Sequence, residues 1–325
     1  MNFIPYYTLN TSHSEALSDL YFSYPSSTLS SKQLLATSSN DKYISIYSLS
    51  NTNEPVPSVN MEWKYKYHLY GINKLIFNKD NTLLASGSND LSVNVVDVNK
   101  QCLLRNFRHE SIVTCLDFNS TSNLLIVGTY DYSIFLYDMR SRNLVIKIIS
   151  DSEPITSVTF SDDCSVIYST SYDSFCRIWD CFKFNCLKTI ALENSPSINS
   201  CTVLPNERYV MLNGFNSQIE IIDIVTEEEI KKFKGHKHSN YLVDCDYYKG
   251  KNGKYYVVSG DEEGKMWNWE VKGEGKKYVK VGDGNMVVNA VDTCEGLVAV
   301  SGVNDVNNAV YLFKEEEEEE DDSKE

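Results

Sequence analysis

The 325-residue sequence lacks the features that mark membrane, secreted and metal-binding proteins. It has no apolar run of about 18 residues, the length that a membrane-spanning helix requires. Residues 1–17 lack a basic stretch followed by an apolar core, so we expect no secretion signal. The nine cysteines never form a C-x-x-C pair, which favours reduced cysteines in a cytosolic or nuclear protein. We therefore expect no metal and no other cofactor.

A basic surface is also missing. The formal net charge is −15, and Glu315–Glu325 alone carries nine acids and one lysine, which leaves −7 for the remaining residues. Because a nucleic-acid groove needs a continuous basic surface, we expect no direct nucleic-acid partner. We expect residues 1–314 to form the folded body and residues 315–325 a disordered acidic tail. Such a tail either solubilises the protein or docks on a basic partner.

Catalytic patterns are absent as well. The sequence shows no nucleophile–base pair, no glycine-rich phosphate loop and no metal-ligand spacing. Asp261-Glu262-Glu263-Gly264 resembles a metal loop in composition, but it coincides with a turn of the repeat described below. We therefore predict that the protein is not an enzyme.

A repeating β unit is what the sequence does contain. Its clearest copy begins with a strand at Tyr168–Ser171, continues through Phe175–Trp179 and reaches Cys186–Ile190. Asp173, in the first turn, is placed to accept hydrogen bonds from turn N–H groups. Ile-Trp-Asp at the end of the second strand, at Asp180, is the signature of a WD repeat.

The turn of this unit recurs along the chain. Its copies are Ser39-Asn40-Asp41, Ser88-Asn89-Asp90, Thr129-Tyr130-Asp131, Ser171-Tyr172-Asp173, Gly214-Phe215-Asn216, Asp261-Glu262-Glu263 and Val303-Asn304-Asp305. Successive copies are 49, 41, 42, 43, 47 and 42 residues apart. A period of about 40–45 residues is typical of four-stranded propeller blades. The sequence therefore predicts an all-β fold, a seven-bladed WD-repeat β-propeller.

Histidines and the N-terminal strand support the same fold. His68 and His109 each precede their turn aspartate by 22 residues, and His13 and His236 occupy the same place in blades with longer insertions. In the WD-repeat pattern such a histidine donates to the turn aspartate of its own blade. Phe3–Leu9 has no blade of its own, so we expect it to be the outer strand of the seventh blade and to close the ring.

A closer resemblance appears in the fourth blade and downstream. The strings SYDSFCRIWD and CLKTI are followed by Gly235-His236-Lys237, Tyr241 and the strand Val257-Val258-Ser259-Gly260. Together they are similar to the fungal-type WD-repeat scaffold subunit of the COMPASS (SET/MLL) histone H3 methyltransferase complexes. This resemblance implies a non-catalytic nuclear chromatin protein that helps to assemble a histone H3 lysine-4 methyltransferase. Its partners would be the SET-domain catalytic subunit and another WD-repeat subunit, with the histone H3 tail as a further candidate.

The resemblance implies two peptide-binding sites. The first is the mouth of the central channel, where the family holds an arginine-containing segment of the catalytic subunit. The matching positions are Ser18, Asn40, Asn73, Asn89, Thr114, Tyr130, Thr156, Tyr172, Asn199, Phe215, Tyr241, Asp244 and Glu262. The second is a groove between blades five and six for an acidic-aliphatic peptide. Its matching positions are Asn206, Tyr209, Ile221, Lys231 and Tyr247.

Three positions depart from the family pattern. The family stacks two phenylalanines on the arginine, where this chain has Thr114 and Asp244, and Lys249 replaces an aliphatic residue of the groove. Stacking of this kind contributes about 1–2 kcal/mol when it is desolvated. Our hypothesis is that Asp244 compensates by pairing with the arginine. The alternative is a polar channel rim with no bound arginine.

A different adaptor role fits the same fold. WD-repeat propellers also serve ubiquitin ligases, RNA-processing particles and transport complexes. A ligase adaptor usually carries an extra helical domain or a basic degron pocket, and the sequence shows neither. Scaffolding of a methyltransferase complex is therefore our first interpretation, and an adaptor of another complex is the second.

Overall fold

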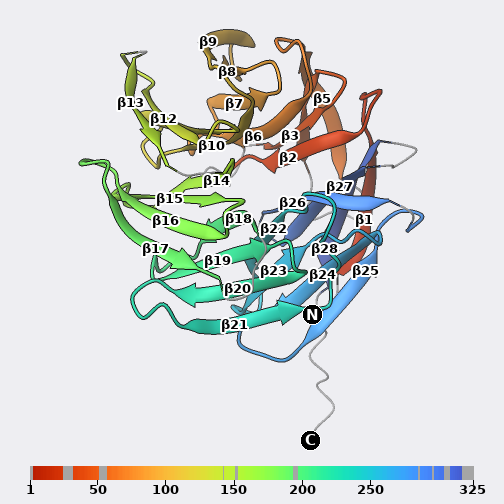
Figure 1. The fold of residues 1–325 in the computed structure, drawn as a ribbon. Helices are drawn as coiled ribbons and strands as arrows, with labels where there is room; N and C mark the ends of the chain where they lie inside the picture. Colours follow the sequence, from red (N-terminus) through yellow and green to blue (C-terminus); the bar gives the residue numbers. More distant parts are fainter. Residues whose placement is uncertain are drawn as a thin grey trace, which may run out of the picture.

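The structure is a computed structural model that describes residues 3–24, 32–50, 57–141, 143–150, 153–192, 197–284, 286–294, 296–303 and 308–316. Within these residues the secondary structure is entirely β, in seven four-stranded antiparallel sheets. The sheets stand around a common centre as the blades of a propeller (Figure 1). The predicted fold class and blade number are confirmed. The described residues contain no helix long and apolar enough to cross a membrane.

Each blade is a meander whose first strand lies innermost in blades one to six. Blades one to three comprise β2 (Leu17–Phe22), β3 (Gln33–Ser39), β4 (Ile44–Ser50), β5 (Ser58–Tyr65); β6 (Ile72–Phe77), β7 (Leu83–Ser88), β8 (Ser92–Asp97), β9 (Cys102–Arg108); and β10 (Val113–Phe118), β11 (Leu124–Thr129), β12 (Ser133–Asp138), β13 (Leu144–Ile149). Blades four to six comprise β14 (Ile155–Phe160), β15 (Val166–Ser171), β16 (Phe175–Asp180), β17 (Cys186–Ala191); β18 (Ile198–Val203), β19 (Tyr209–Gly214), β20 (Gln218–Asp223), β21 (Glu229–Lys234); and β22 (Cys245–Lys249), β23 (Tyr255–Ser259), β24 (Lys265–Glu270), β25 (Lys276–Lys280).

The N-terminal strand closes the ring. Blade seven comprises β26 (Val287–Cys294), β27 (Leu297–Val303), β28 (Ala309–Glu315) and β1 (Phe3–Asn10), with β1 paired antiparallel to β28. β26 packs against both β22 and β2, which joins the last blade to its two neighbours. The predicted closing strand is confirmed.

β28 also includes Glu315, which we expected to begin the tail. Its side chain is buried and accepts hydrogen bonds from the backbone N–H of Lys251, at 3.1 and 3.2 Å. The folded body therefore extends past residue 314. The remaining acidic run, 317–325, lies outside the described residues, as does the predicted seventh turn residue Asp305.

The hydrophobic core is divided among the junctions between blades. Strands with a mostly buried central segment, such as β15, pack their apolar side chains between neighbouring sheets. At the junction of blades three and four, for example, Leu136 and Ile155 pack with Trp179, the tryptophan of the WD signature. Trp179 also donates its indole N–H to Ser169 at 2.9 Å, so this large side chain is buried without an unsatisfied donor.

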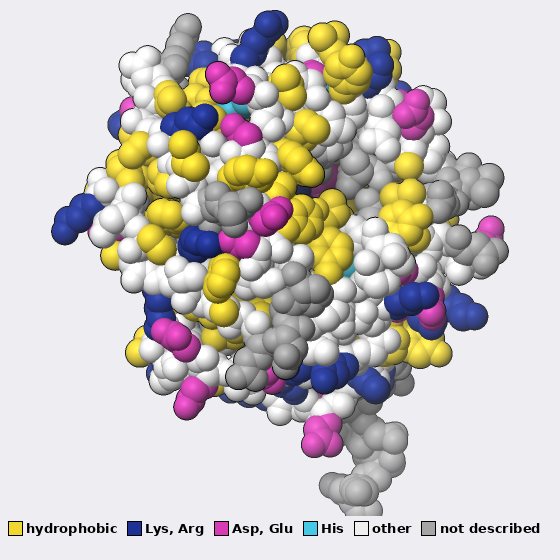
Figure 2. Space-filling view, viewed as in Figure 1, with side chains coloured by type: hydrophobic (Ala, Val, Ile, Leu, Met, Phe, Trp, Pro, Cys, Tyr) yellow, Lys and Arg dark blue, Asp and Glu magenta, His cyan; other side chains and the backbone are white. Residues whose placement is uncertain are grey.

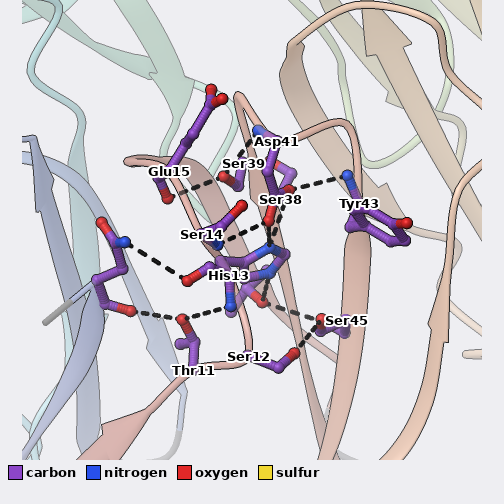
Figure 3. Close-up of polar contacts among 12 residues, drawn as sticks. Thr11, Ser12, His13, Ser14, Glu15, Ser38, Ser39, Asp41, Tyr43 and Ser45 are labelled. Atoms are coloured by element: carbon purple, nitrogen blue, oxygen red, sulfur yellow. Dashed lines mark hydrogen bonds and ion pairs between the residues drawn. The ribbon is translucent and has the colours of Figure 1, made fainter.

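The turn aspartates order the loops as the sequence predicts. Asp173 accepts the backbone N–H of Phe175 at 3.1 Å. Asp41 lies 3.1 Å from Nδ1 of His13, and Nε2 of the same ring lies 3.0 Å from Thr37 (Figure 3). The His68–Asp90 pair repeats this arrangement at 3.0 Å. These contacts tie the entry of blades one and two to the second turn of the same blade.

The other two histidines of the repeat do not make this contact. His109 and His236 are held by packing instead, and neither ring has a hydrogen-bond partner within the described residues. His109 lies edge-on to Phe135, and His236 lies edge-on to Trp269. Burial lowers the pKa of both rings to about 4, so they are neutral at physiological pH. The expectation of a histidine–aspartate bond holds for His13 and His68 only.

Buried carboxylates join neighbouring blades at the channel. Each accepts a backbone N–H from the innermost strand of the next blade: Asp19 from Leu75, Asp117 from Phe160, Asp246 from Thr293 and Asp292 from Phe22, at 2.5 to 3.0 Å. Burial raises the pKa of Asp117 to about 7, although the hydrogen bonds from Phe160 and Thr159 oppose the shift. Desolvation likewise raises the pKa values of Asp246 and Asp292.

We predict that ring closure dominates thermal stability. Deleting residues 1–10 exposes the edge of β28 and removes Phe3 and Leu9 from the core, at about 1.5–3 kcal/mol for each side chain. The melting temperature should fall by roughly 10 °C or more, measured by circular dichroism. Deleting residues 317–325 should leave it unchanged. An unchanged melting temperature for the N-terminal deletion would show that β1 does not stabilise the ring.

The buried carboxylates predict a pH dependence. A carboxyl group whose folded pKa is about 7 holds its proton longer in the folded state, so its contribution to stability declines as pH rises from about 4 to 7. Asp117→Asn keeps an acceptor for Phe160 but cannot ionise. The variant should melt a few degrees above wild type at pH 8 and at the same temperature near pH 4.5. Asp162→Asn, on an exposed turn, is the control and should leave the pH profile unchanged.

Candidate functional site

A ring of polar side chains lines the channel mouth, one from each blade. Six come from the second or third residue of an innermost strand, at or beside a register irregularity: Ser18, Asn73, Thr114, Thr156, Asn199 and Asn289. In blade six the equivalent position is Asp244, just before β22. A β-bulge re-aims the side chain of its extra residue, which explains why these positions face the channel. We call these seven residues the bulge ring.

Several members of the bulge ring also link one blade to the next. The side-chain amide of Asn73 donates to the carbonyl oxygen of Val113 at 2.8 Å, and that of Asn199 donates to Val243 at 2.7 Å. The amide of Asn289 donates to Ser18 at 3.2 Å, across the closure between blades seven and one. The ring is therefore held by the scaffold in a fixed geometry.

The bulge ring lies in a cavity of about 620 Å³. Turn residues form its second tier: Asn40, Asn89, Tyr130 and Tyr172, with Tyr241 and Leu242 from the loop before β22. Figure 2 shows the centre of the ring hollowed, with hydrophobic side chains gathered around the opening. The structure thus brings together all the predicted mouth residues except Phe215 and Glu262.

These two residues lie beside the cavity instead. The ring of Phe215 packs between Tyr172, at 5.8 Å, and His238, at 4.6 Å between ring centroids. Glu262 accepts backbone N–H groups of Ser239, Asn240 and Tyr241 at 2.5 to 3.0 Å. Partial burial alone would raise the pKa of Glu262, but these hydrogen bonds outweigh it and lower that pKa to about 2. Glu262 therefore holds the loop that carries Tyr241 and is not among the residues that line the cavity, so its role at the mouth stays a prediction.

A lysine that the sequence did not indicate lies between two carboxylates at the centre of the site. Lys74 follows Asn73 on β6, and its Nζ lies 2.8 Å from Asp244 and 3.1 Å from Asp19. Burial would lower the pKa of Lys74, but the two carboxylates outweigh it and raise that pKa above its ordinary value. Burial raises the pKa of Asp19 to about 6, against the opposing effect of Lys74. The cluster of Lys74, Asp19 and Asp244 combines one lysine with two aspartates, a formal net charge of −1.

The residues at the mouth offer hydrogen-bonding groups and charge. Thr114, one of the two departures from the family pattern, donates its hydroxyl to the carbonyl oxygen of Gly128 at 3.1 Å. Among the described residues, no group of three or more His, Cys, Asp or Glu side chains could hold a metal ion. The mouth is thus suited to bind a segment of another molecule through amides, hydroxyls and one net negative charge.

The predicted second groove is largely committed to the fold. Ile221 is only 2% exposed and packs with Tyr209 and Tyr247 in the core between blades five and six. Nζ of Lys231 donates to the carbonyl oxygens of Glu270, Val271 and Gly273 in blade six. Asn206 is exposed in the turn before β19. Tyr209, Ile221, Lys231 and Tyr247 lie at one junction, but packing between the blades covers Ile221. The groove stays a prediction, with Ile221 serving the core.

This ring with its polar mouth is a WD-repeat β-propeller, a class whose members generally act as scaffolds for other proteins. Within the class, the chain belongs to the family described as nucleolar protein 10-like, N-terminal domain, whose model matches residues 30–224.

The chain is also similar to several individual WD-repeat proteins with different names. COMPASS component SWD3 of Saccharomyces cerevisiae is 26% identical over 234 residues, which span 67% of this chain and 73% of that protein. Human pre-mRNA-processing factor 17 is 27% identical over 212 residues, 62% of this chain and 36% of that protein. The WD repeat domain-containing protein 83 homolog of Dictyostelium discoideum is 22% identical over 286 residues, 78% of this chain and 83% of that protein.

We predict that Lys74 stabilises the channel by neutralising its carboxylates. Lys74→Met leaves Asp19 and Asp244 without a cation, which should lower the free energy of unfolding by about 2 kcal/mol at pH 7.5. The loss should shrink at pH 5, because Asp19 then takes up a proton. Urea denaturation at the two pH values measures both effects.

The matched control is Lys79→Met, which removes an exposed ion pair with Asp162 and should cost less than about 1 kcal/mol. Equal losses for the two variants at both pH values would show that the Lys74 cluster has no special role.

Proposed function

We propose that the chain is a non-catalytic nuclear scaffold of a COMPASS-like histone H3 lysine-4 methyltransferase complex. In this proposal the channel mouth holds an extended segment of the SET-domain catalytic subunit. The observation that carries it is the bulge ring, a rigid polar cavity with one net negative charge. The similarity to COMPASS component SWD3, which spans 73% of that protein, supports the choice of complex.

The charge of the mouth suits an arginine side chain. Lys74 can keep its contact with the buried Asp19 while Asp244, whose side chain is 27% exposed, turns one oxygen to a guanidinium group. Because the cluster carries one negative charge, a second cation is electrostatically favourable. Among the described residues that line the cavity there is no phenylalanine, so in this proposal pairing with Asp244 replaces stacking.

A second WD-repeat subunit would contact the junction of blades five and six. Ile221 and Lys231 are occupied within the fold, so such a contact would use the exposed Asn206 and Lys249 together with the partly buried Tyr209 and Tyr247. The histone H3 tail is a further candidate for the mouth, since it also carries arginine and lysine side chains.

A second candidate is an adaptor of an RNA-processing particle. Three findings favour it: the family described as nucleolar protein 10-like, and relatives named pre-mRNA-processing factor 17 and U3 small nucleolar RNA-associated protein 21. In this role the acidic body would contact proteins of the particle rather than its RNA. Both candidates are consistent with a nuclear location.

We test the proposal by purifying the tagged chain from cells and identifying co-purifying proteins by mass spectrometry. Wild type should recover the SET-domain subunit. Asp244→Asn removes the charge and keeps the side-chain volume, so recovery should fall by about tenfold or more. Phe182→Ala, a 79%-exposed residue in the β16–β17 turn, is the control and should recover as much as wild type.

Three results would count against the proposal. Recovery of RNA-processing proteins without a SET-domain subunit would favour the second candidate. Equal recovery by Asp244→Asn would show that the mouth charge does not hold the partner. An equal loss with Phe182→Ala would show that the effect is not local to the mouth.

A further inference from the structure

One edge of blade six is rich in lysine, although the chain as a whole is acidic. The segment Tyr247–Tyr256 contains three lysines and no acid, and the segment Glu270–Lys280 contains four lysines and two acids. Their net charge is therefore +5. Lys249, Lys251 and Lys254 of the first segment are exposed, as are Lys276 and Lys277 of the second. We call these five residues the lysine edge.

A cleft of about 360 Å³ adjoins this edge, between blades six and seven. Its wall in blade six is formed by Met266, Asn268 and the residues Lys276–Val279, and Phe3 of β1 forms the wall in blade seven. Tyr278 is 52% exposed and packs against the ring of Trp267. The cleft therefore combines two ammonium groups with an aromatic wall.

The chain leaves the folded body beside this cleft. Glu315, the last residue of β28, is the register partner of Phe3, so the two backbones are neighbours in one sheet. The carboxylate of Glu315 also accepts the backbone N–H of Lys251, which places the end of β28 against the lysine edge. One acidic residue is thus already held at this edge within the fold.

We propose that residues 316–325 of this chain dock on the lysine edge and cover the cleft. Residues 317–325 contain seven acids and one lysine, a net charge of −6 that complements the +5 of the edge. Nine residues span about 30 Å when extended, which is enough to cross from β28 to β25. The segment starts at the site, so its local concentration there is in the millimolar range and weak contacts suffice.

The consequence is competition at this surface. An acidic segment of another protein that suits the lysine edge must displace the chain's own residues 316–325. The interaction is electrostatic and exposed, so it weakens as salt shortens the Debye length from about 10 Å at 0.1 M to 3 Å at 1 M.

A labelled peptide tests the docking. Fluorescein-labelled peptide of residues 316–325 is titrated, at 50 mM NaCl, with the full chain and with a chain that ends at Glu316, and fluorescence anisotropy is recorded. The shortened chain should bind the peptide at least about tenfold more tightly, because its site is open. Circular dichroism should show the same melting temperature for both chains.

Two pairs of substitutions in the shortened chain locate the site. Lys276→Gln with Lys277→Gln should weaken peptide binding by about tenfold, whereas Lys100→Gln with Lys183→Gln, at exposed positions of blades two and four, should not change it. Raising the salt to 1 M should abolish binding to the shortened chain.

Each alternative result overturns the proposal. Equal binding by the full and shortened chains would mean that the edge is open to an acidic partner segment rather than covered by residues 316–325. If the two double variants bound the peptide equally well, the peptide would contact another part of the surface. Absence of binding to the shortened chain would show that the edge does not recognise this sequence.

Discussion

The antiparallel pairing of β1 with β28 is the constraint on which the molecule depends. Each blade buries its apolar faces only against two neighbours, so an open ring would leave two faces in water. The pairing joins residues about 300 positions apart and makes the last blade from both ends of the sequence. Because blade seven then contacts blade one, every sheet acquires two neighbours and the channel acquires a fixed diameter.

Closure is also what gives the bulge ring its geometry. Its members come from seven separate strands, and their side chains meet only because the strands surround one axis. The amide of Asn199 donates across one blade junction, and the carboxylates of Asp117 and Asp292 accept backbone N–H groups across two others. Polar groups therefore bind the blades together near the axis, and apolar side chains do so farther out.

Much of this arrangement could be predicted from the sequence, because it repeats. The period of the turns sets the number of blades, and a fixed distance from each turn locates residues such as Thr114 and Tyr130. The repeat is a poorer guide where a blade departs from the common length. In blade six the loop before β22 is longer than in the other blades, and its residues 239–241 donate backbone N–H groups to Glu262. These hydrogen bonds hold the Glu262 side chain at the loop.

Other features depend on contacts that a repeat pattern does not encode. Lys74 occupies an ordinary strand position, and only the approach of Asp19 and Asp244 from blades one and six makes it part of the site. Asn289 was missed because blade seven has no histidine to mark its start. Ile221 was predicted as a peptide contact from the resemblance to the COMPASS scaffold subunit, but packing between blades covers its side chain.

The Lys74 cluster also breaks the symmetry of the ring. Seven equivalent blades with a uniform rim would bind a segment in seven rotational settings of equal energy. A single ionic cluster, contributed by blades one, two and six, distinguishes one sector from the others. A ligand with one charged group would therefore be bound in one orientation about the channel axis, so a nearly symmetric scaffold can hold an asymmetric complex.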